Sequence, residues 1–276
     1  DANPRLGGLN EYGLATYKTT GGFAQKEIDW LLSIGGIETR LGTRLGTDVQ
    51  LDTLTGDYDA VFLGLGLAGV NSIGIEEPKA AGVRNAVEFI AELRQAPTYA
   101  QVPVGRRVVV IGGGMTAVDA AVQSRKLGAE SVTIVYRRGA EDMSASGHEQ
   151  DWAQKNGVHI RHWATPQALL TADGHITGVQ FGYTHVAGGK LAETGEQFTL
   201  EADMVLKAIG QSFVAQPVGS SIELKQGRIV TNEEGRTSNA KVWAGGDCRV
   251  GGRDLTVEAV EHGKVAALSI HAALSR

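Results

Sequence analysis

Short apolar runs that end on glycine recur along the chain, and this pattern predicts buried strands of a parallel sheet. The clearest run extends from Val108 to Ile111, and three glycines follow it at once. A helical pattern then covers 118–127 and stops at Gly128, where a glycine C-cap is expected. A second apolar run at 131–136 completes the order strand, glycine turn, helix and strand, which predicts a βαβ unit.

The remaining apolar runs extend the same architecture. Three more of them close on glycine, at 59–66, 204–210 and 242–247. A helical pattern from 255 to 274 follows the last one. Shorter segments alternate between apolar and polar residues, at 159–163, 176–183 and 198–200. We expect these to be antiparallel strands appended to the parallel sheet, so the predicted fold class is α/β.

Composition and charge narrow the range of functions. The 276 residues, of which 42% are hydrophobic, suffice for about two domains with their own cores. The net charge of -5 and the scattered Lys and Arg residues favour no nucleic-acid partner. We find neither an apolar run of membrane-spanning length nor a signal-peptide pattern in residues 1–30, so we expect a cytoplasmic protein without a membrane partner.

The chain has a single cysteine, Cys248, which we interpret as a small buried residue beside a glycine-rich turn. One cysteine cannot form an intrachain disulfide or a Cys-x-x-Cys pair, and it cannot hold an iron-sulfur cluster unaided. The seven histidines show no metal-ligand spacing, so we predict no metal site. Redox chemistry in this chain would therefore depend on a bound cofactor.

The glycines after the first predicted strand have the spacing of a dinucleotide-binding loop, Gly112-x-Gly114-x-x-Ala117. The first glycine permits a tight turn, the second lets the backbone approach a pyrophosphate, and the small third residue lets the helix pack on the strand. The amino end of the helix offers free N–H groups to the diphosphate. Gly113 and Thr116 lie between these positions, and we include them among the candidate cofactor-binding residues.

The residues after the second predicted strand bear on the choice of coenzyme. An acid at this position would bind the ribose 2'-hydroxyl, but the chain has Tyr136, Arg137 and Arg138. The two arginines favour NADP(H), and the alternative is an ordinary solvated edge. Asp119, early in the helix, has two interpretations that we leave open: stabilisation of the helix dipole or a catalytic role.

Three features together resemble the family of two-dinucleotide-domain flavoproteins, which contains glutathione reductase-like enzymes and the glutamate synthase small subunit. They are residues 1–9, the loop at Gly112 and the stretch 244–247 before a helix. The resemblance implies that Asp1, ahead of Gly7 and Gly8, binds the FAD adenosine ribose. It also places Gly246 and Asp247 against the ribityl or pyrophosphate part of the flavin.

Within this family, the segments 108–138, 157–163, 207–211 and 243–248 are most similar to the flavin subunits of bacterial NAD-dependent dihydropyrimidine dehydrogenases. That resemblance implies FAD and NAD(P)H as cofactors. It also implies an electron-accepting catalytic partner of the FMN and iron-sulfur type that reduces uracil or thymine. The alternatives are an NADPH oxidoreductase like the glutamate synthase small subunit, or a non-catalytic nucleotide-binding or assembly module. The resemblance implies NAD(H), whereas the arginines favour NADP(H).

The expected domain organisation is discontinuous. Residues 1–103 and 212–276 would form an FAD-binding domain, truncated because its first strand and glycine loop would precede Asp1. Residues 104–211 would form an inserted NAD(P)H-binding domain, so the chain would contain two Rossmann-like domains. Gly66 and Gly210 end the strands where the chain would cross, and both are candidate cofactor-binding residues. Hydride transfer between nicotinamide and flavin depends on stacking, so we predict no particular catalytic side chain.

Overall fold

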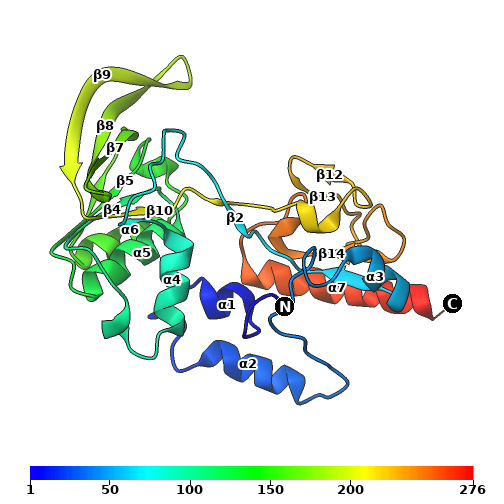
Figure 1. Ribbon diagram of the computed structural model, residues 1–276. Helices are drawn as coiled ribbons and strands as arrows, with labels where there is room; N and C mark the ends of the chain where they lie inside the picture. The colour runs from blue at the N-terminus through cyan, green and yellow to red at the C-terminus, as the bar shows by residue number, and fades with distance from the viewer. Residues whose placement is uncertain (276) are drawn as a thin grey trace. The chain divides into compact units, whose positions relative to one another are not determined.

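The computed structural model describes residues 1–275, and they form two compact units (Figure 1). Unit 1 contains Asp1–Leu9, Gln25–Gly69 and the chain from Gln211 onward; unit 2 contains Asn10–Ala24 and Val70–Gly210. Three elements begin in one unit and end in the other: α1 (Gly8–Tyr12), α2 (Phe23–Leu32) and β2 (Gly69–Val70). β2 pairs with β11 (Gln211–Ser212).

Unit 2 is built on a five-stranded sheet whose strands are all parallel. In spatial order they are β3 (Val83–Asn85), β10 (Met204–Lys207), β4 (Arg107–Ile111), β5 (Ser131–Val135) and β6 (Val158–Arg161). The helical elements of the unit are α4 (Ala86–Gln95), η1 (Tyr99–Gln101), α5 (Met115–Lys126), η2 (Ala140–Asp142) and α6 (Gly147–Lys155). A separate antiparallel sheet contains β7 (Ala164–Ala172), β8 (His175–Ala187) and β9 (Lys190–Glu201).

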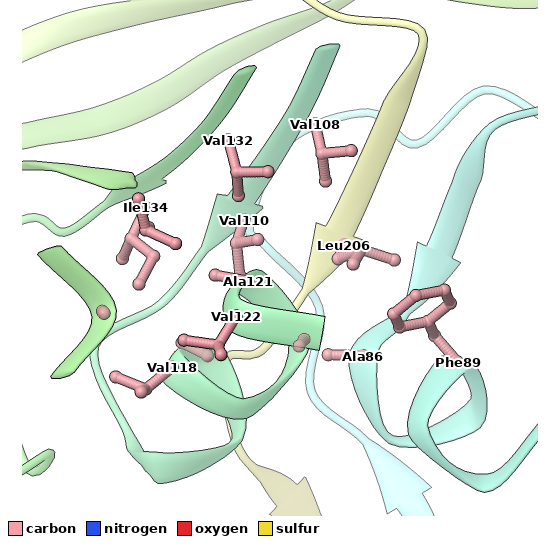
Figure 2. Packing of buried hydrophobic residues seen from close by; sticks show 14 of the residues in the cluster. Ala86, Phe89, Val108, Val110, Val118, Ala121, Val122, Val132, Ile134 and Leu206 are labelled. Atoms are coloured by element: carbon pink, nitrogen blue, oxygen red, sulfur yellow. The ribbon is translucent and has the colours of Figure 1, made fainter. Parts of the chain in front are cut away.

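Both faces of the parallel sheet are buried because successive side chains of a strand point to opposite faces. Val108 and Val110 of β4 pack with α4 and α5 in one core cluster (Figure 2). Val109 and Ile111 pack with the antiparallel sheet in a second cluster. The continuous apolar run in the sequence therefore reflects a strand that is covered from both sides.

Unit 1 has a smaller core around two parallel strands, β1 (Val61–Leu63) and β14 (Val242–Ala244). Its other elements are α3 (Leu51–Asp57), η3 (Gln216–Val218), β12 (Leu224–Lys225), β13 (Arg228–Ile229), η4 (Gly246–Cys248) and α7 (Thr256–Leu274). Cys248 is fully buried in this core, which confirms its interpretation from the sequence. The α/β fold class is also confirmed.

One predicted strand has the wrong direction. The segment 159–163 is not antiparallel, because β6 runs parallel to β5 at the edge of the five-stranded sheet. The crossover through α6 returns the chain in the same direction, as parallel pairing requires. Segments 176–183 and 198–200 lie in antiparallel strands as expected, but they pair in a sheet of their own.

The units also divide at a different place from the expected domains. The first long crossing lies between Gly69 and Val70, not near residue 103. The reason is that β3 pairs with β10, while Phe89 and Ile90 of α4 belong to the core of unit 2. The later crossing, after Gly210, lies one residue from the expected boundary. Among the described residues, no helix combines the length and apolarity that a bilayer crossing needs.

Candidate functional site

The turn between β4 and α5 requires glycine at its first position. Gly112 has a φ of 143°, and its N–H donates to the carbonyl oxygen of Val135 at 3.1 Å. A Cβ atom at Gly112 would lie 2.1 Å from the carbonyl oxygen of Ala208. The tight turn that the sequence predicts at Gly112 is therefore set by its neighbours on both sides, β5 and the end of β10.

The next two glycines shape a concave backbone. A Cβ at Gly113 would lie 2.5 Å from the ring of Tyr136, so the ring packs directly against this peptide. At Gly114 the nearest atom among the described residues is Ser144 Oγ, 3.1 Å from the Cβ position. Gly114 is the N-cap of α5, with extended backbone and no side-chain cap. The first N–H groups of the helix, at Met115 and Thr116, therefore face outward without an intrahelical partner.

This geometry fits the diphosphate of a dinucleotide. A phosphate bound at the amino end of α5 would accept from free N–H groups in the positive end of the helix dipole. Ala117 is fully buried in the core of unit 2, so its small side chain allows the close approach of helix and sheet that the motif predicts. Thr116 is half-buried beside the same helix end.

Arg137 and Arg138 follow β5, the neighbour of β4, so they lie at the same carboxyl edge as the glycine loop. Both side chains are exposed, and neither guanidinium has an ion pair or hydrogen bond within residues 1–275. Their backbones are held in place, because Thr184 Oγ1 donates to the Arg137 carbonyl at 2.8 Å. The Trp163 N–H donates to the Arg138 carbonyl at 3.2 Å.

Sequence reasoning missed the turn after β6. Trp163 has a φ of 60°, a left-handed backbone that costs a bulky residue about 1–2 kcal/mol. The predicted strand at 159–163 would give Trp163 an extended backbone, and nothing in the sequence pattern contradicts that. The hydrogen bonds to Arg138 and from the Thr184 N–H, at 2.9 Å, hold the turn beside the two arginines.

A second glycine-rich edge lies in unit 1, where β1 and β14 end side by side. Gly66 follows β1 with a φ of 62°, and Gly246 follows β14 with a φ of 78°. A Cβ at Gly66 would lie 3.8 Å from Asp247 Oδ1, so the structure brings these three candidate residues together. The Gly246 N–H donates to Nδ1 of His262 at 3.2 Å.

The Asp247 carboxyl is half-buried at this edge. Burial raises its pKa, and the nearby Asp254 adds to the increase, whereas Arg228 opposes it. A half-buried carboxyl group of this kind is suited to accept hydrogen bonds from ligand hydroxyl groups. The edge therefore fits the ribityl part of a flavin through Asp247 and the small Gly66 and Gly246.

The remaining candidates are placed separately. The Asp1 carboxylate accepts from the Asn3 N–H at 2.8 Å, and the Asp1 carbonyl accepts from the Thr43 N–H at 2.9 Å. Gly7 and Gly8 form the turn into α1, with φ values of 120° and 52°. No hydrogen bond in the described residues joins these three positions to Gly66 or Asp247. Gly210 accepts from the Asn71 N–H at 3.2 Å where unit 2 ends.

Comparison with known proteins identifies the family. The sequence profile of the pyridine nucleotide-disulphide oxidoreductase family matches residues 11–263. The chain belongs to this family. NAD(P)H and FAD are the cofactors of its members, so the family assignment confirms the predicted cofactor pair and the class of NAD(P)H-dependent flavoprotein oxidoreductases.

Curated relatives within the pyridine nucleotide-disulphide oxidoreductases are longer than this chain. The glutamate synthase [NADPH] small chain of Escherichia coli is 36% identical over 97% of this chain and 61% of its own length. The NADP(+)-dependent formate dehydrogenase subunit beta of Moorella thermoacetica is 33% identical over 98% of this chain and 39% of its own length. The chain thus spans less than two thirds of these relatives.

A solved member of the wider fold supports the architecture. FprA from Mycobacterium tuberculosis, in complex with NADPH, matches with a TM-score of 0.76 over 99% of this chain and 76% of that chain. At 19% identity, this likeness shows the fold alone.

Asp119 lies beyond the first turn of α5, where the helix dipole is felt most, and is almost fully buried. Its carboxylate accepts from the Tyr17 hydroxyl at 2.9 Å and from the Ala15 N–H at 3.3 Å, and it pairs with Lys18 Nζ at 2.8 Å. Asp119 therefore holds residues 15–18, which we call the 15–18 turn, against α5.

Proposed function

We propose that this chain binds NADPH at the carboxyl edge of β4 and β5 and passes its electrons through FAD to a partner subunit. One observation carries the choice of coenzyme: two arginines that have no partner within residues 1–275 lie beside the glycine loop at an uncapped helix N-terminus. A 2'-phosphate is the part of NADPH that NADH lacks, and arginine binds phosphate through charge-assisted, often bidentate hydrogen bonds.

Each part of the edge has its own task in this proposal. The free N–H groups of Met115 and Thr116 bind the diphosphate, and Gly114 leaves room for its approach. Arg137 and Arg138 bind the 2'-phosphate. The relatives named for NADPH or NADP(+) support this choice over the NAD(H) that the sequence resemblance implies.

The edge of unit 1 would hold the flavin. Asp247 would accept hydrogen bonds from the ribityl hydroxyls, and Gly66 and Gly246 would allow the close approach. Asp1, Gly7 and Gly8 remain predicted contacts of the adenosine part. FAD, when bound, accepts a hydride from nicotinamide and can release electrons one at a time. The protein's contribution is binding, orientation and exclusion of water, so no side chain is assigned a proton-transfer role.

Small chains and beta subunits among the relatives support an electron-accepting partner. Within this proposal we predict a partner of the FMN and iron-sulfur type that reduces uracil or thymine, and glutamate synthesis is the alternative. Neither final substrate is expected to contact the described residues. Reduction assays with NADPH, the chain and each candidate partner would separate the two acceptors.

The coenzyme proposal is tested by the double variant Arg137→Ala/Arg138→Ala. We expect its Kd for NADPH to rise at least tenfold while the Kd for NADH is unchanged, because only NADPH carries the 2'-phosphate. The matched control is Arg106→Ala/Arg107→Ala, an adjacent pair at the start of β4 that forms ion pairs with Glu130 and Glu201. Equal losses for both coenzymes in the first variant would reject the phosphate role.

Visible flavin absorbance of the purified chain tests the other half of the proposal. We expect a bound flavin that NADPH bleaches. A colourless chain that still binds NADPH, and that gains no flavin from added FAD, would favour the nucleotide-binding or assembly module instead.

A further inference from the structure

The turn that connects β6 to β7 has a residue that does not suit its backbone. Only three non-glycine residues of the described chain have a positive φ: Trp163, Asp173 and Gln226. The turn carries the chain from the parallel sheet into the antiparallel one, which requires the left-handed conformation at Trp163 but not its indole. Glycine or asparagine would adopt this backbone at lower cost.

Hydrogen bonds fix this residue beside the arginines. The Trp163 N–H donates to the carbonyl of Arg138, and the next N–H along the chain, from Ala164, donates to Tyr136 at 3.1 Å. Thr184 closes the arrangement, because its N–H donates to Trp163 and its hydroxyl donates to Arg137. Trp163 thus lies at the same edge as the unpaired guanidinium groups, on a backbone with little freedom.

The indole of Trp163 is only partly covered by the protein. It is partly exposed, and its N–H and ring have no hydrogen bond or ring contact within residues 1–275. Two of the other three tryptophans differ: Trp243 donates to Ser269, and Trp152 contacts the ring of Tyr17. An indole that is partly exposed, makes no hydrogen bond within residues 1–275 and lies on a strained backbone is available to a flat ligand.

We infer that Trp163 determines affinity for the adenosine end of the coenzyme, with its indole stacked on the adenine base while Arg137 and Arg138 bind the 2'-phosphate. This inference rests on the proposed function, since it names a further residue of the same site. The purine base offers a flat π-face that an aromatic side chain binds regardless of the groups at its edge. Stacking and phosphate binding are therefore separate contributions that separate variants can remove.

The test uses adenosine 2',5'-bisphosphate and adenosine 5'-monophosphate as probes of the chain. Trp163→Gly should weaken both probes about tenfold, because both carry the base. Trp163→Phe should keep most of the affinity, since it retains an aromatic face. Arg137→Ala/Arg138→Ala should weaken the bisphosphate far more than the monophosphate.

Urea unfolding of each variant separates an effect on folding from an effect on binding. Trp163→Gly relieves the left-handed backbone but removes a partly buried indole, so its affinities are compared at a urea concentration of zero only after its folded state is shown. Asp173→Gly is the matched control: it relieves a left-handed backbone in the β7–β8 turn and should leave both affinities unchanged. If Trp163→Gly nevertheless lost its fold, the fluorescence of the parent would decide, because stacking should quench Trp163 and leave Trp163→Phe unresponsive.

Failure of the stacking role and failure of the proposed function give different results. A parent chain that binds neither probe would reject the proposed function and the inference together. A parent that binds the bisphosphate through its arginines, with Trp163→Gly binding equally well, would reject the stacking role alone.

Discussion

The two units each present glycines at the carboxyl ends of neighbouring parallel strands, but the protein supports these two edges very differently. In unit 2 the edge belongs to a five-stranded sheet that is buried on both faces. In unit 1 the edge belongs to a two-stranded pair. The long helix of unit 1, α7, buries only Ala266 and exposes Val257, Val260 and Leu268.

The contrast extends to the glycines themselves. A Cβ at Gly112 or Gly113 would overlap protein atoms, so packing fixes the shape of the dinucleotide loop before any ligand binds. At Gly66 and Gly246 no atom of the described residues lies closer than 3.7 Å to a built Cβ, so only their backbone angles call for glycine. We conclude that the loop of unit 2 is part of the fold as well as of the site, whereas at Gly66 and Gly246 the backbone angles, and not packing, call for glycine.

The largest expected difference is in the free energy of unfolding of two variants, Gly112→Ala and Gly66→Ala. The new methyl group at 112 would overlap the Ala208 carbonyl and also adopt an unfavourable φ, so we expect a loss of about 3–5 kcal/mol in the free energy of unfolding. At 66 only the backbone cost applies, about 1–2 kcal/mol. Urea unfolding followed by tryptophan fluorescence measures both losses.

Gly128→Ala is the control for the backbone term in unit 2. Gly128 has a φ of 104°, and no atom lies within 4 Å of its built Cβ among the described residues. Its cost should resemble that of Gly66→Ala. Similar costs at 112 and 128 would show that the contact with Ala208 is unimportant and that the contrast between the edges is wrong.

The parts of unit 2 that sequence reasoning recovers are local. The sequence predicts the βαβ unit that begins at Val108, because its strand, glycine turn and helix follow one another within about twenty residues. The same holds for β14 and α7 in unit 1. The direction of β6 was not recoverable from alternation alone, since a half-buried parallel edge strand alternates just as an antiparallel strand does.

Contacts between distant parts of the sequence account for the rest. The 15–18 turn contacts Asp119, which lies more than a hundred residues further along the chain. The spacing of apolar residues cannot predict a contact between such distant segments. The left-handed turn at Trp163 depends on hydrogen bonds to Arg138 and Thr184. The division at Gly69 reflects the pairing of β3 with β10, which again joins remote segments.

The second prediction replaces the buried Asp119 of unit 2 and the half-buried Asp247 of unit 1 by asparagine. Asp119→Asn removes the charge that Lys18 and the Tyr17 hydroxyl stabilise, so we expect a loss of about 2 kcal/mol in the stability of unit 2. Asp247→Asn should be neutral or slightly stabilising without FAD, because burial and Asp254 already disfavour its charge. Pulse proteolysis, with fragments mapped to each unit, measures the two effects separately.

Glu196→Gln is a suitable control, since it replaces an exposed carboxylate in β9 and should change neither unit. If Asp247→Asn lost as much stability as Asp119→Asn, the protein would stabilise the Asp247 carboxylate as strongly as that of Asp119. The contrast between the two units would then be wrong.

The smallest expected effect is a pair of opposite pH dependences, each below about 1 kcal/mol because both groups are partly exposed. Burial alone would raise the pKa of Glu149 in α6, but hydrogen bonds from Lys18 and Ser146 outweigh it and hold the pKa below its ordinary value. Its stabilising contribution is therefore present above pH 4.5 and is lost as the pH falls through the lowered pKa.

Asp247 should act in the opposite direction. Its raised pKa means that the folded state binds the proton more tightly than the unfolded chain, so its contribution is greatest below pH 3.8 and is lost as the pH rises through the raised pKa. On acidification unit 2 should thus lose the contribution of Glu149 while unit 1 gains that of Asp247, which the lowered pKa of Glu258 opposes. Unit-resolved proteolysis with an acid-active protease between about pH 3.5 and 6 would show both slopes. Glu149→Gln and Asp247→Asn should change the slopes of their own units in opposite directions, and changes of the same sign would contradict the difference between the two carboxylates.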